Sequence, residues 1–428
     1  GGVRYALLYP NWDFTGSSYF GCRETHLPLE LLFARQQLEA AGHTVLLLDG
    51  HLQGLGPAEA GRRVADFRPD FTVITTAPSY LFWRCPQPEL RVPAAWLAAA
   101  RHGVTVAIGP HPSATPGATL RKLDCEVALR GEPDFILPRL ATERWQQIEG
   151  CCWREDGGVH LDSRLPQADL GQLAALDWHD YPLALRRHRH HAFHGQGRGA
   201  ELEFSRGCPW NCTFCNKSLF RNRFRQRPVT AVLAEAEALA RVGFDYVYFI
   251  DEIFGCGARR RELLAGLADL PLTIGMETRI DLWEEESLEA LAAAHCVSME
   301  CGIESITPDG RERFAKHCRL STERIAALLT FARRRIPWVQ ANLIAEPDDD
   351  RQAIAAWRRE LIAAGVWVSE PVPVFAFPGS PLYTQLFGPP EEDAWERAHA
   401  RYLAGNAAHG FSDIQEVTPQ PLAALETP

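Results

Sequence analysis

The chain has 428 residues, and 44 Lys and Arg stand against 54 Asp and Glu, which gives a net charge of −10. Domains commonly hold ~100–200 residues, so this length predicts about three folding units or two large ones. With 46% apolar and 23% charged residues, the composition excludes disordered and fibrous proteins. The acidic balance argues against a nucleic-acid partner, which favours a basic stripe. No apolar run approaches the ~18 residues of a membrane span. No signal segment precedes the first predicted strand, so we expect a cytoplasmic protein without a membrane partner.

The first third of the chain alternates short apolar runs with helical segments. Strands are predicted at 4–10, 44–49, 71–76, 105–108 and 125–129, with helices at 29–41, 58–67, 94–101 and 115–123. Strands that alternate with helices indicate a doubly wound parallel sheet. We therefore expect an α/β, Rossmann-like domain over residues 1–145, which would bind a ligand beyond the carboxyl ends of its strands. No GxGxxG motif follows the first strand, so a dinucleotide is not expected.

The second α/β unit follows a segment of mixed character. Residues 146–199 show no sustained period and are interpreted as a connector with a small hairpin near 152–162. Strands are then predicted at 201–205, 246–250, 272–277, 297–302, 339–345 and 372–377. Six βα steps fall short of the eight of a full barrel, so we expect a partial (β/α)6 TIM barrel over 200–380. Residues 381–428 would cap its open edge.

Cysteine usage singles out one loop of this barrel. Twelve cysteines in 428 residues are too dilute for a disulfide scaffold. Nine are scattered, but residues 205–217 read SRGCPWNCTFCNK and place Cys208, Cys212 and Cys215 on one loop after the first barrel strand. The carboxyl ends of barrel strands are where active-site loops belong.

Three cysteines on one loop can hold three irons of a cubane cluster and leave the fourth iron open. Thiolates are the usual ligands of iron–sulfur clusters. The alternatives are a zinc site or a chance arrangement, but structural zinc favours four ligands in paired spacings. No fourth ligand lies nearby in the sequence. The loop therefore predicts a [4Fe-4S] cluster with Cys208, Cys212 and Cys215 as its ligands and catalytic centre.

The three cysteines, with Phe214 before the third, resemble the signature of the radical S-adenosylmethionine (SAM) superfamily. Later strands end in similar segments: FIDE at 249–252, TRID at 278–281 and GIES at 302–305. The resemblance implies that the open iron chelates SAM and that one electron cleaves it to a 5′-deoxyadenosyl radical. An external donor such as flavodoxin or ferredoxin would supply that electron. The implied cofactor contacts are Phe214, Asp251, Glu252, Glu277, Arg279, Glu304 and Ser305. The alternative for the Glu and Arg side chains is a structural ion pair at the strand ends.

The order of the units, with GPHPSATP and LRGEPD ahead of the cysteine loop, resembles the cobalamin-binding branch of that superfamily. The resemblance implies cobalamin beyond the first sheet, in contact with Asn11, Trp12, Ser79, Tyr80, Leu81, Gly109, Pro110, His111, Gly131 and Glu132. The segment Asp49-x-His51-x-x-Gly54 spells the pattern whose His ligates cobalt in other cobalamin proteins, but it follows the second strand, so we interpret it as a turn. Water, Tyr80, Leu81 or Trp83 would then face the lower side of the cobalt.

By this resemblance, the leading hypothesis is methyl transfer to an unactivated carbon of a small-molecule substrate. Two alternatives stay open: a radical cyclisation or rearrangement without methyl transfer, and a non-catalytic cobalamin- or redox-sensing protein. The His-rich segment 186–194 lacks regular ligand spacing and is interpreted as a solvated linker rather than a metal site. Nothing in the sequence names the substrate.

Overall fold

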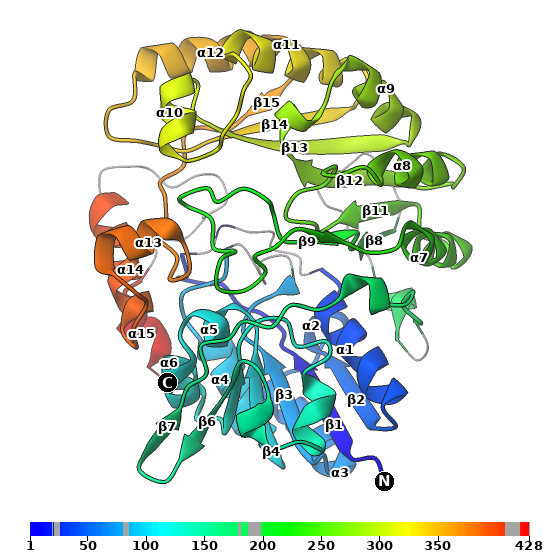
Figure 1. Ribbon diagram of the computed structural model, residues 1–428, viewed down its shortest axis with the longest axis vertical. Helices are drawn as coiled ribbons and strands as arrows, with labels where there is room; N and C mark the ends of the chain where they lie inside the picture. The colour runs from blue at the N-terminus through cyan, green and yellow to red at the C-terminus, as the bar shows by residue number, and fades with distance from the viewer. Residues whose placement is uncertain are drawn as a thin grey trace.

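Two α/β units follow one another along the long axis of the molecule (Figure 1). The computed structural model describes residues 1–18, 20, 26–79, 85–178, 181–186, 198–406 and 420–427. The first unit is built on a seven-stranded sheet and the second on a six-stranded parallel sheet. The predicted fold class, a doubly wound sheet followed by a partial barrel, is confirmed.

The first sheet has the strand order β2-β1-β3-β4-β5-β6-β7. Its strands are β1 Arg4–Tyr9, β2 Thr44–Asp49, β3 Phe71–Thr75, β4 Val104–Ile108, β5 Val127–Leu129, β6 Cys151–Glu155 and β7 Gly158–His160. Its helices are α1 Leu29–Ala40, α2 Gly50–Gln53, α3 Pro57–Phe67, α4 Arg91–Ala99, α5 Pro110–Ala114 and α6 Pro116–Leu123. The strands β1 to β5 are parallel and carry an apolar core on each face, as both faces of a doubly wound sheet require.

Two details of this sheet bear on the predictions. The hairpin expected near 152–162 exists as β6 and β7, but it pairs antiparallel with β5 and so extends the first sheet. That part of the predicted connector therefore belongs to the first unit. The segment 49–54 is a turn, as we interpreted it: Asp49 caps the short helix α2 by accepting from the Leu52 N–H, and Gly54 ends it in the left-handed region. The side chain of His51 is exposed.

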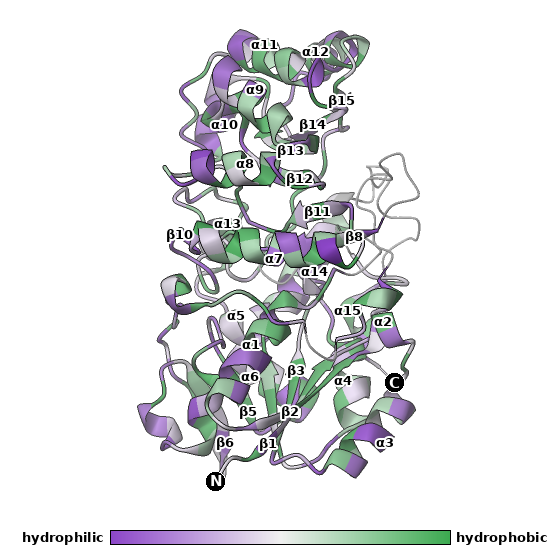
Figure 2. Cartoon of the chain, turned by 90° about the vertical axis from the view of Figure 1, so that its right-hand side faces the viewer, coloured by the Kyte–Doolittle hydropathy of each residue, from purple (hydrophilic) through white to green (hydrophobic). Residues whose placement is uncertain are grey.

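The second sheet has the order β15-β14-β13-β12-β11-β8, and all of its pairings are parallel. Its strands are β8 Gly199–Leu202, β11 Tyr246–Phe249, β12 Thr273–Thr278, β13 Cys296–Glu304, β14 Trp338–Leu343 and β15 Trp367–Val368. Its helices are α7 Val229–Arg241, α8 Arg260–Ala268, α9 Glu285–Ala293, α10 Pro308–Arg313, α11 Thr322–Arg333 and α12 Arg351–Ala363. Figure 2 shows hydrophilic and hydrophobic residues side by side along helices such as α3 and α7, as helices with one buried face require.

The strand predicted at 372–377 is wrong. The sixth strand is β15, and of the predicted run only Val372 keeps a single parallel bridge, to Ile344. Pro371 and Pro373 explain the difference, because proline has no N–H to donate to a ladder. The aromatic residues of this run, Phe375 and Phe377, pack instead in a separate cluster with the C-terminal helices.

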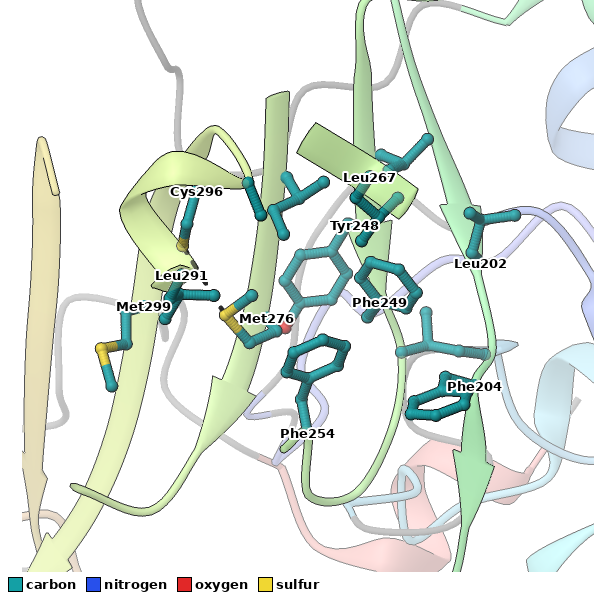
Figure 3. Close-up of a cluster of buried hydrophobic side chains, with 14 of the residues drawn as sticks. Leu202, Phe204, Tyr248, Phe249, Phe254, Leu267, Met276, Leu291, Cys296 and Met299 are labelled. Atoms are coloured by element: carbon teal, nitrogen blue, oxygen red, sulfur yellow. Dashed lines mark hydrogen bonds between the residues drawn. The ribbon is translucent and has the colours of Figure 1, made fainter. Parts of the chain in front are cut away.

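The barrel core is built from side chains that leave little room for larger ones. Figure 3 shows part of it: aromatic rings and aliphatic chains from β8, β11, β12 and β13 pack together, with the Cys296 thiol against the sulfur of Met276. A Cβ on Gly275 would lie 2.3 Å from the Tyr246 hydroxyl, so this strand position needs glycine. Cys296 and Cys301 are buried in this core and pack as small apolar side chains.

Two of the C-terminal helices lie beside the first unit. The C-terminal helices are α13 Pro381–Phe387, α14 Ala394–Asn406 and α15 Leu422–Glu426, and Figure 1 places α14 and α15 next to α5 and α6. Trp395 Nε1 donates to Thr115 Oγ1 at 2.9 Å, and Lys122 forms ion pairs with Glu396 at 2.7 Å and Glu426 at 3.0 Å. These contacts join the segment to the first unit, and the capping of the barrel edge by residues 381–428 stays a prediction. Within the described part of the chain, no helix is both long and apolar enough to cross a membrane.

A buried arginine joins the two units. Arg206 lies on β9 Ser205–Arg206 and is fully buried. Its guanidinium donates to Glu132 at 2.9 Å, to Asp134 at 2.7 and 2.9 Å and to Glu203 at 2.6 Å. Arg225, on the neighbouring strand β10 Arg225–Gln226, donates to both oxygens of Glu132 at 3.0 and 2.5 Å. The loop after β5 is thereby fixed to the strand that leads into the cysteine loop.

The turn from β8 to β9 depends on Asp251. Its Oδ1 accepts from the Phe204 N–H at 2.9 Å, and its Oδ2 accepts from the Ser205 hydroxyl at 2.5 Å. Burial raises the pKa of this carboxyl to about 8, despite the two hydrogen bonds, which favour the ionised form. Asp251 is therefore neutral at pH 7 in the folded protein.

We predict that Arg206→Met destabilises the protein by about 3–5 kcal/mol, because it leaves buried carboxylates without their cation. The free energy of unfolding from urea titrations checks this value. The matched control is Arg62→Met on α3, where the ion pair with Glu59 is exposed. Such an exposed pair contributes little to stability, because water and salt screen it. Equal stability of the two variants would contradict the structural role of Arg206.

Asp251 gives the protein a specific pH dependence. Between about pH 4 and pH 8 the carboxyl is ionised in the unfolded chain and neutral in the folded one, so its contribution to stability falls as pH rises through this window. We expect the melting temperature of wild type to drop more steeply from pH 5 to pH 8 than that of Asp251→Asn. Asp156→Asn, at an exposed turn, serves as the control. Parallel pH profiles of wild type and Asp251→Asn would contradict this prediction.

Candidate active site

The cysteine loop leaves the carboxyl end of the barrel and lies between the two units (Figure 1). Its first turn needs Gly207, which has a φ of 80° and whose Cβ, if present, would lie 2.0 Å from the Arg223 carbonyl oxygen. The Thr213 N–H donates to the Phe314 carbonyl at 3.0 Å, and the Leu382 N–H donates to the Thr213 carbonyl at 2.8 Å. The loop is thus held from the barrel and from the C-terminal helices.

The three thiols of this loop suit a metal cluster in their chemistry. All three cysteines carry reduced thiols outside any disulfide, and all three are half-buried. Burial raises the pKa of Cys208 to about 11 and also raises that of Cys212, where Lys316 and Arg279 act in the opposite direction. Over the residues with described positions, no three Cys, His, Asp or Glu side chains are gathered closely enough to hold a metal ion. A bound iron cation would convert the thiols to thiolates, so the chemistry of this donor set fits a cluster.

Arg279 places a cation beside the cysteine loop. Its guanidinium lies 4.1 Å from the centre of the Trp210 ring, a cation–π contact with the loop itself. It donates to Asp281 at 2.9 and 2.8 Å and to the Lys316 carbonyl at 2.7 Å. Its Nη1 is buried and has no hydrogen-bond partner among the described residues. That nitrogen is a donor available to an anionic ligand.

Glu304 and Ser305 line a cavity at the carboxyl ends of β13 and β14. Its volume is about 220 Å³, and its other lining residues are Ile306, Thr307, Arg313, Leu343, Ile344, Asp348, Asp349, Asp350, Ala353 and Ile354. Glu304 adopts a φ of 63°, which is uncommon for a residue with a side chain and often marks a functional site. A Cβ on Gly302 would lie 2.6 Å from the Glu304 carboxylate, and a Cβ on Gly310 would lie 1.9 Å from the Ser305 hydroxyl.

The sequence left open a structural ion pair between the Glu and Arg side chains at the strand ends. Ion pairs do form there, but each of these residues has a different partner. Arg279 pairs with Asp281, whereas Glu304 pairs with Lys316, a residue that the sequence did not single out. Of the remaining predicted SAM contacts, Asp251 is engaged in the β8–β9 turn, and Glu252 lies 4.0 Å from Arg221. Glu277 is half-buried on β12, and Phe214 packs edge-on against Phe314.

The first unit offers a second crevice, where its strand order reverses between β1 and β3. Ligands of doubly wound sheets bind at this switch point. Ser79 lies there: its N–H donates to the Tyr9 hydroxyl and its own hydroxyl donates to Glu30, both at 2.9 Å. Burial raises the pKa of Glu30 to about 7, and its Oε1 has no hydrogen-bond partner among the described residues. Sequence reasoning missed Glu30; its signal is a carboxylate within the apolar run LELLFA.

Other predicted cobalamin contacts fall at the strand ends but differ in accessibility. Gly109 and Gly131 both adopt positive φ values, 109° and 75°, that glycine permits. Pro110 is buried at the start of α5, Trp12 is half-buried against Phe14, and Asn11 is exposed. Tyr80, Leu81 and Trp83 lie outside the described residues, as do residues 187–194 of the His-rich segment.

Two predicted contacts are occupied within the protein. His111 is fully buried, stacks on Trp395 with ring centres 4.1 Å apart, and bonds through Nε2 to the Gln87 carbonyl at 2.8 Å. Burial lowers its pKa to about 3, so the ring is neutral and covered by α14. Glu132 has both carboxylate oxygens bonded to Arg206 and Arg225. The LRGEPD segment thus supplies an inter-domain ion pair where the sequence predicted a cofactor contact.

Comparison with known proteins fits this geometry. Residues 202–357 match the Radical SAM superfamily model. An uncharacterized methyltransferase of Pyrococcus horikoshii is 25% identical over 326 residues, which cover 73% of this chain and 68% of that protein. The hopanoid C-3 methylase of Methylococcus capsulatus is 28% identical over 356 residues, which cover 78% of this chain and 64% of that protein. The chain thus spans about two thirds of the length of these relatives.

Solved structures share the arrangement of both units. The radical SAM methyltransferase TsrM of Kitasatospora setae, with cobalamin and a [4Fe-4S] cluster bound, has a TM-score of 0.68 at 19% identity over 89% of this chain and 74% of its own. The cobalamin-dependent radical SAM enzyme OxsB, with aqua-cobalamin and SAM bound, has a TM-score of 0.65 at 14% identity over 94% of this chain and 66% of its own. This chain therefore contains a radical SAM domain and has the two-unit fold of the cobalamin-dependent radical SAM enzymes.

Proposed function

We propose that the chain is a cobalamin-dependent radical SAM enzyme that transfers a methyl group to an unactivated carbon of a small molecule. The observation that carries this proposal is the position of the cysteine loop. Its three cysteines lie at the carboxyl end of a partial barrel, between that barrel and a sheet with a switch point of the kind that binds ligands. The names of the relatives, a methyltransferase and a methylase, support methyl transfer as the outcome.

Cys208, Cys212 and Cys215 would hold a [4Fe-4S] cluster, which supplies the electron that cleaves SAM. Arg279 and Lys316 lie beside this loop as cations, and the buried Nη1 of Arg279 can donate to a carboxylate of SAM. The cavity beside Glu304 and Ser305 combines hydroxyl and carboxylate groups with the aliphatic side chains of Ile306, Leu343, Ile344 and Ile354. Such a lining suits the ribose and the base of a nucleoside.

Cobalamin, which supplies the methyl group, would bind at the switch point of the first sheet. Ser79, Tyr9 and Glu30 form a buried polar patch there, and Gly109 and Gly131 allow the backbone to approach a large ligand. Asn11, Trp12 and Pro110 would contact it from the neighbouring strand ends. An external carrier such as flavodoxin or ferredoxin would deliver the electron, and the protein would work in the cytoplasm.

Product analysis tests this function without knowledge of the substrate. The protein is loaded anaerobically with iron, sulfide and cobalamin, then given SAM and a chemical reductant. We expect wild type to form 5′-deoxyadenosine, and to form S-adenosylhomocysteine only when cobalamin is present. Cys212→Ser should lose the visible absorbance of the cluster and reduce 5′-deoxyadenosine to background, because a thiolate ligand is removed. Cys256→Ser, another half-buried cysteine, should retain both.

The outcomes separate the alternatives. 5′-Deoxyadenosine without any S-adenosylhomocysteine would contradict methyl transfer and favour a cyclisation or rearrangement. A stable cluster that never cleaves SAM would favour a sensing role. Cleavage that persists in Cys212→Ser would overturn the assignment of this loop as the catalytic centre.

A further inference from the structure

Lys316 stands on an unusual turn that the proposed function does not explain. Both of its neighbours, Ala315 and His317, adopt left-handed conformations with φ values of 56° and 51°. Side chains disfavour this region, and two such residues within three positions persist only where the surrounding structure holds them. Lys316 itself is buried, with 5% of its surface exposed. The turn therefore directs a charged side chain inward.

The contacts of Lys316 join two strand ends. Its ammonium donates to the Gly302 carbonyl at 2.6 Å and to the carboxylate of Glu304, both at the end of β13. Its carbonyl accepts from Arg279, which follows β12. The Lys316 N–H donates to the Arg311 carbonyl at 3.1 Å and so closes the turn.

The turn that carries Lys316 is bonded to the cysteine loop. The Thr213 N–H of the loop donates at 3.0 Å to the carbonyl of Phe314, two residues before Lys316. Arg279, which donates to the Lys316 carbonyl at 2.7 Å, stacks on Trp210 of the loop. A cation in a buried position acts through a lower effective dielectric than one at the surface, so its influence on a nearby cluster is stronger. Net charge near an iron–sulfur cluster is one of the factors that set its reduction potential.

We propose that Lys316 is a positioning residue that couples the cysteine loop to the cavity beside Glu304 and Ser305. Its ammonium holds the Glu304 carboxylate at the cavity wall, and its charge raises the reduction potential of the cluster. The inference rests on the proposed function for the presence of that cluster. In the relevant step one electron passes from an external donor to the oxidised cluster, and no covalent bond forms or breaks. The added negative charge is stabilised by the ammonium beside it.

The test is a reductive titration of the reconstituted protein, followed by electron paramagnetic resonance, on wild type and four variants. Lys316→Gln removes the charge and should shift the midpoint potential to more negative values. Lys316→Arg keeps the charge and should stay close to wild type. Glu304→Gln removes the compensating carboxylate and should shift the potential in the opposite direction. Arg319→Gln is the matched control, since this nearby cation is exposed and screened by water and salt.

A second readout tests the coupling to the cavity. Equilibrium dialysis with labelled SAM on the oxidised, loaded protein should give weaker binding for Lys316→Gln and unchanged binding for Arg319→Gln. Equal potentials for wild type and Lys316→Gln, at equal iron and sulfide content, would overturn the inference. So would shifts of the same sign for Lys316→Gln and Glu304→Gln. If Lys316→Gln binds no cluster, two other midpoint potentials test the inference. The potential of Glu304→Gln should be shifted to more positive values, and that of Lys316→Arg should stay close to wild type.

The failure of this inference is distinguishable from the failure of the proposed function. A wild-type chain that holds no cluster would overturn both. A loaded wild type that cleaves SAM, with variants whose potentials do not move, would overturn the role of Lys316 alone.

Discussion

The arrangement of the molecule depends on one buried cation. Arg206 has no contact with water and must neutralise carboxylates from both units, namely Glu132 and Asp134 after β5 and Glu203 after β8. Although burial favours the neutral form, Arg206 and Arg221 hold the pKa of Glu203 at about 2, so this carboxylate stays ionised. Removal of any one partner would leave a charge in a medium that cannot solvate it. The geometry of this cluster therefore fixes the first sheet relative to a strand that ends two residues before Cys208.

A contrast between buried carboxyls follows from their different partners. Glu203 is ionised because two arginines face it, whereas Asp251 and Glu30 receive hydrogen bonds but no comparable pairing, and burial raises their pKa values to about 8 and about 7. Charges at the interface of the two units are thus concentrated where an arginine can compensate them. These two carboxyls, whose pKa values are raised by burial, lie at the turn before the cysteine loop and at the switch point of the first sheet. Burial therefore weakens the fixed negative charge at both places.

Much of this organisation could be predicted from local sequence patterns, and the misses have identifiable physical causes. Alternating apolar runs predict nearly all strands, because each buried parallel strand must be apolar. The run at 372–377 fails because Pro371 and Pro373 cannot donate to a ladder. The motif around Glu132 predicts a cofactor contact. Its carboxylate instead binds the buried Arg206, which lies 74 residues away, so no local pattern reveals this pair. The inward position of Lys316 could not be predicted, because it depends on the left-handed turn around this residue. Spacing along the chain does not reveal such a backbone conformation.

The C-terminal segment adds a second set of contacts between the two units, besides those of Arg206. Leu382, at the start of α13, holds the cysteine loop through the Thr213 carbonyl, while Trp395 on α14 stacks on His111 at the end of β4. One continuous segment therefore contacts the cysteine loop of the barrel and the carboxyl end of the first sheet. With the ion cluster around Arg206, the two units are tied at separate points around the region between them. The proposed radical chemistry would need a region shielded from water, and walls held together at several points would provide it. The sequence after the barrel thus acts as a structural part of the site, although it contributes no recognisable motif.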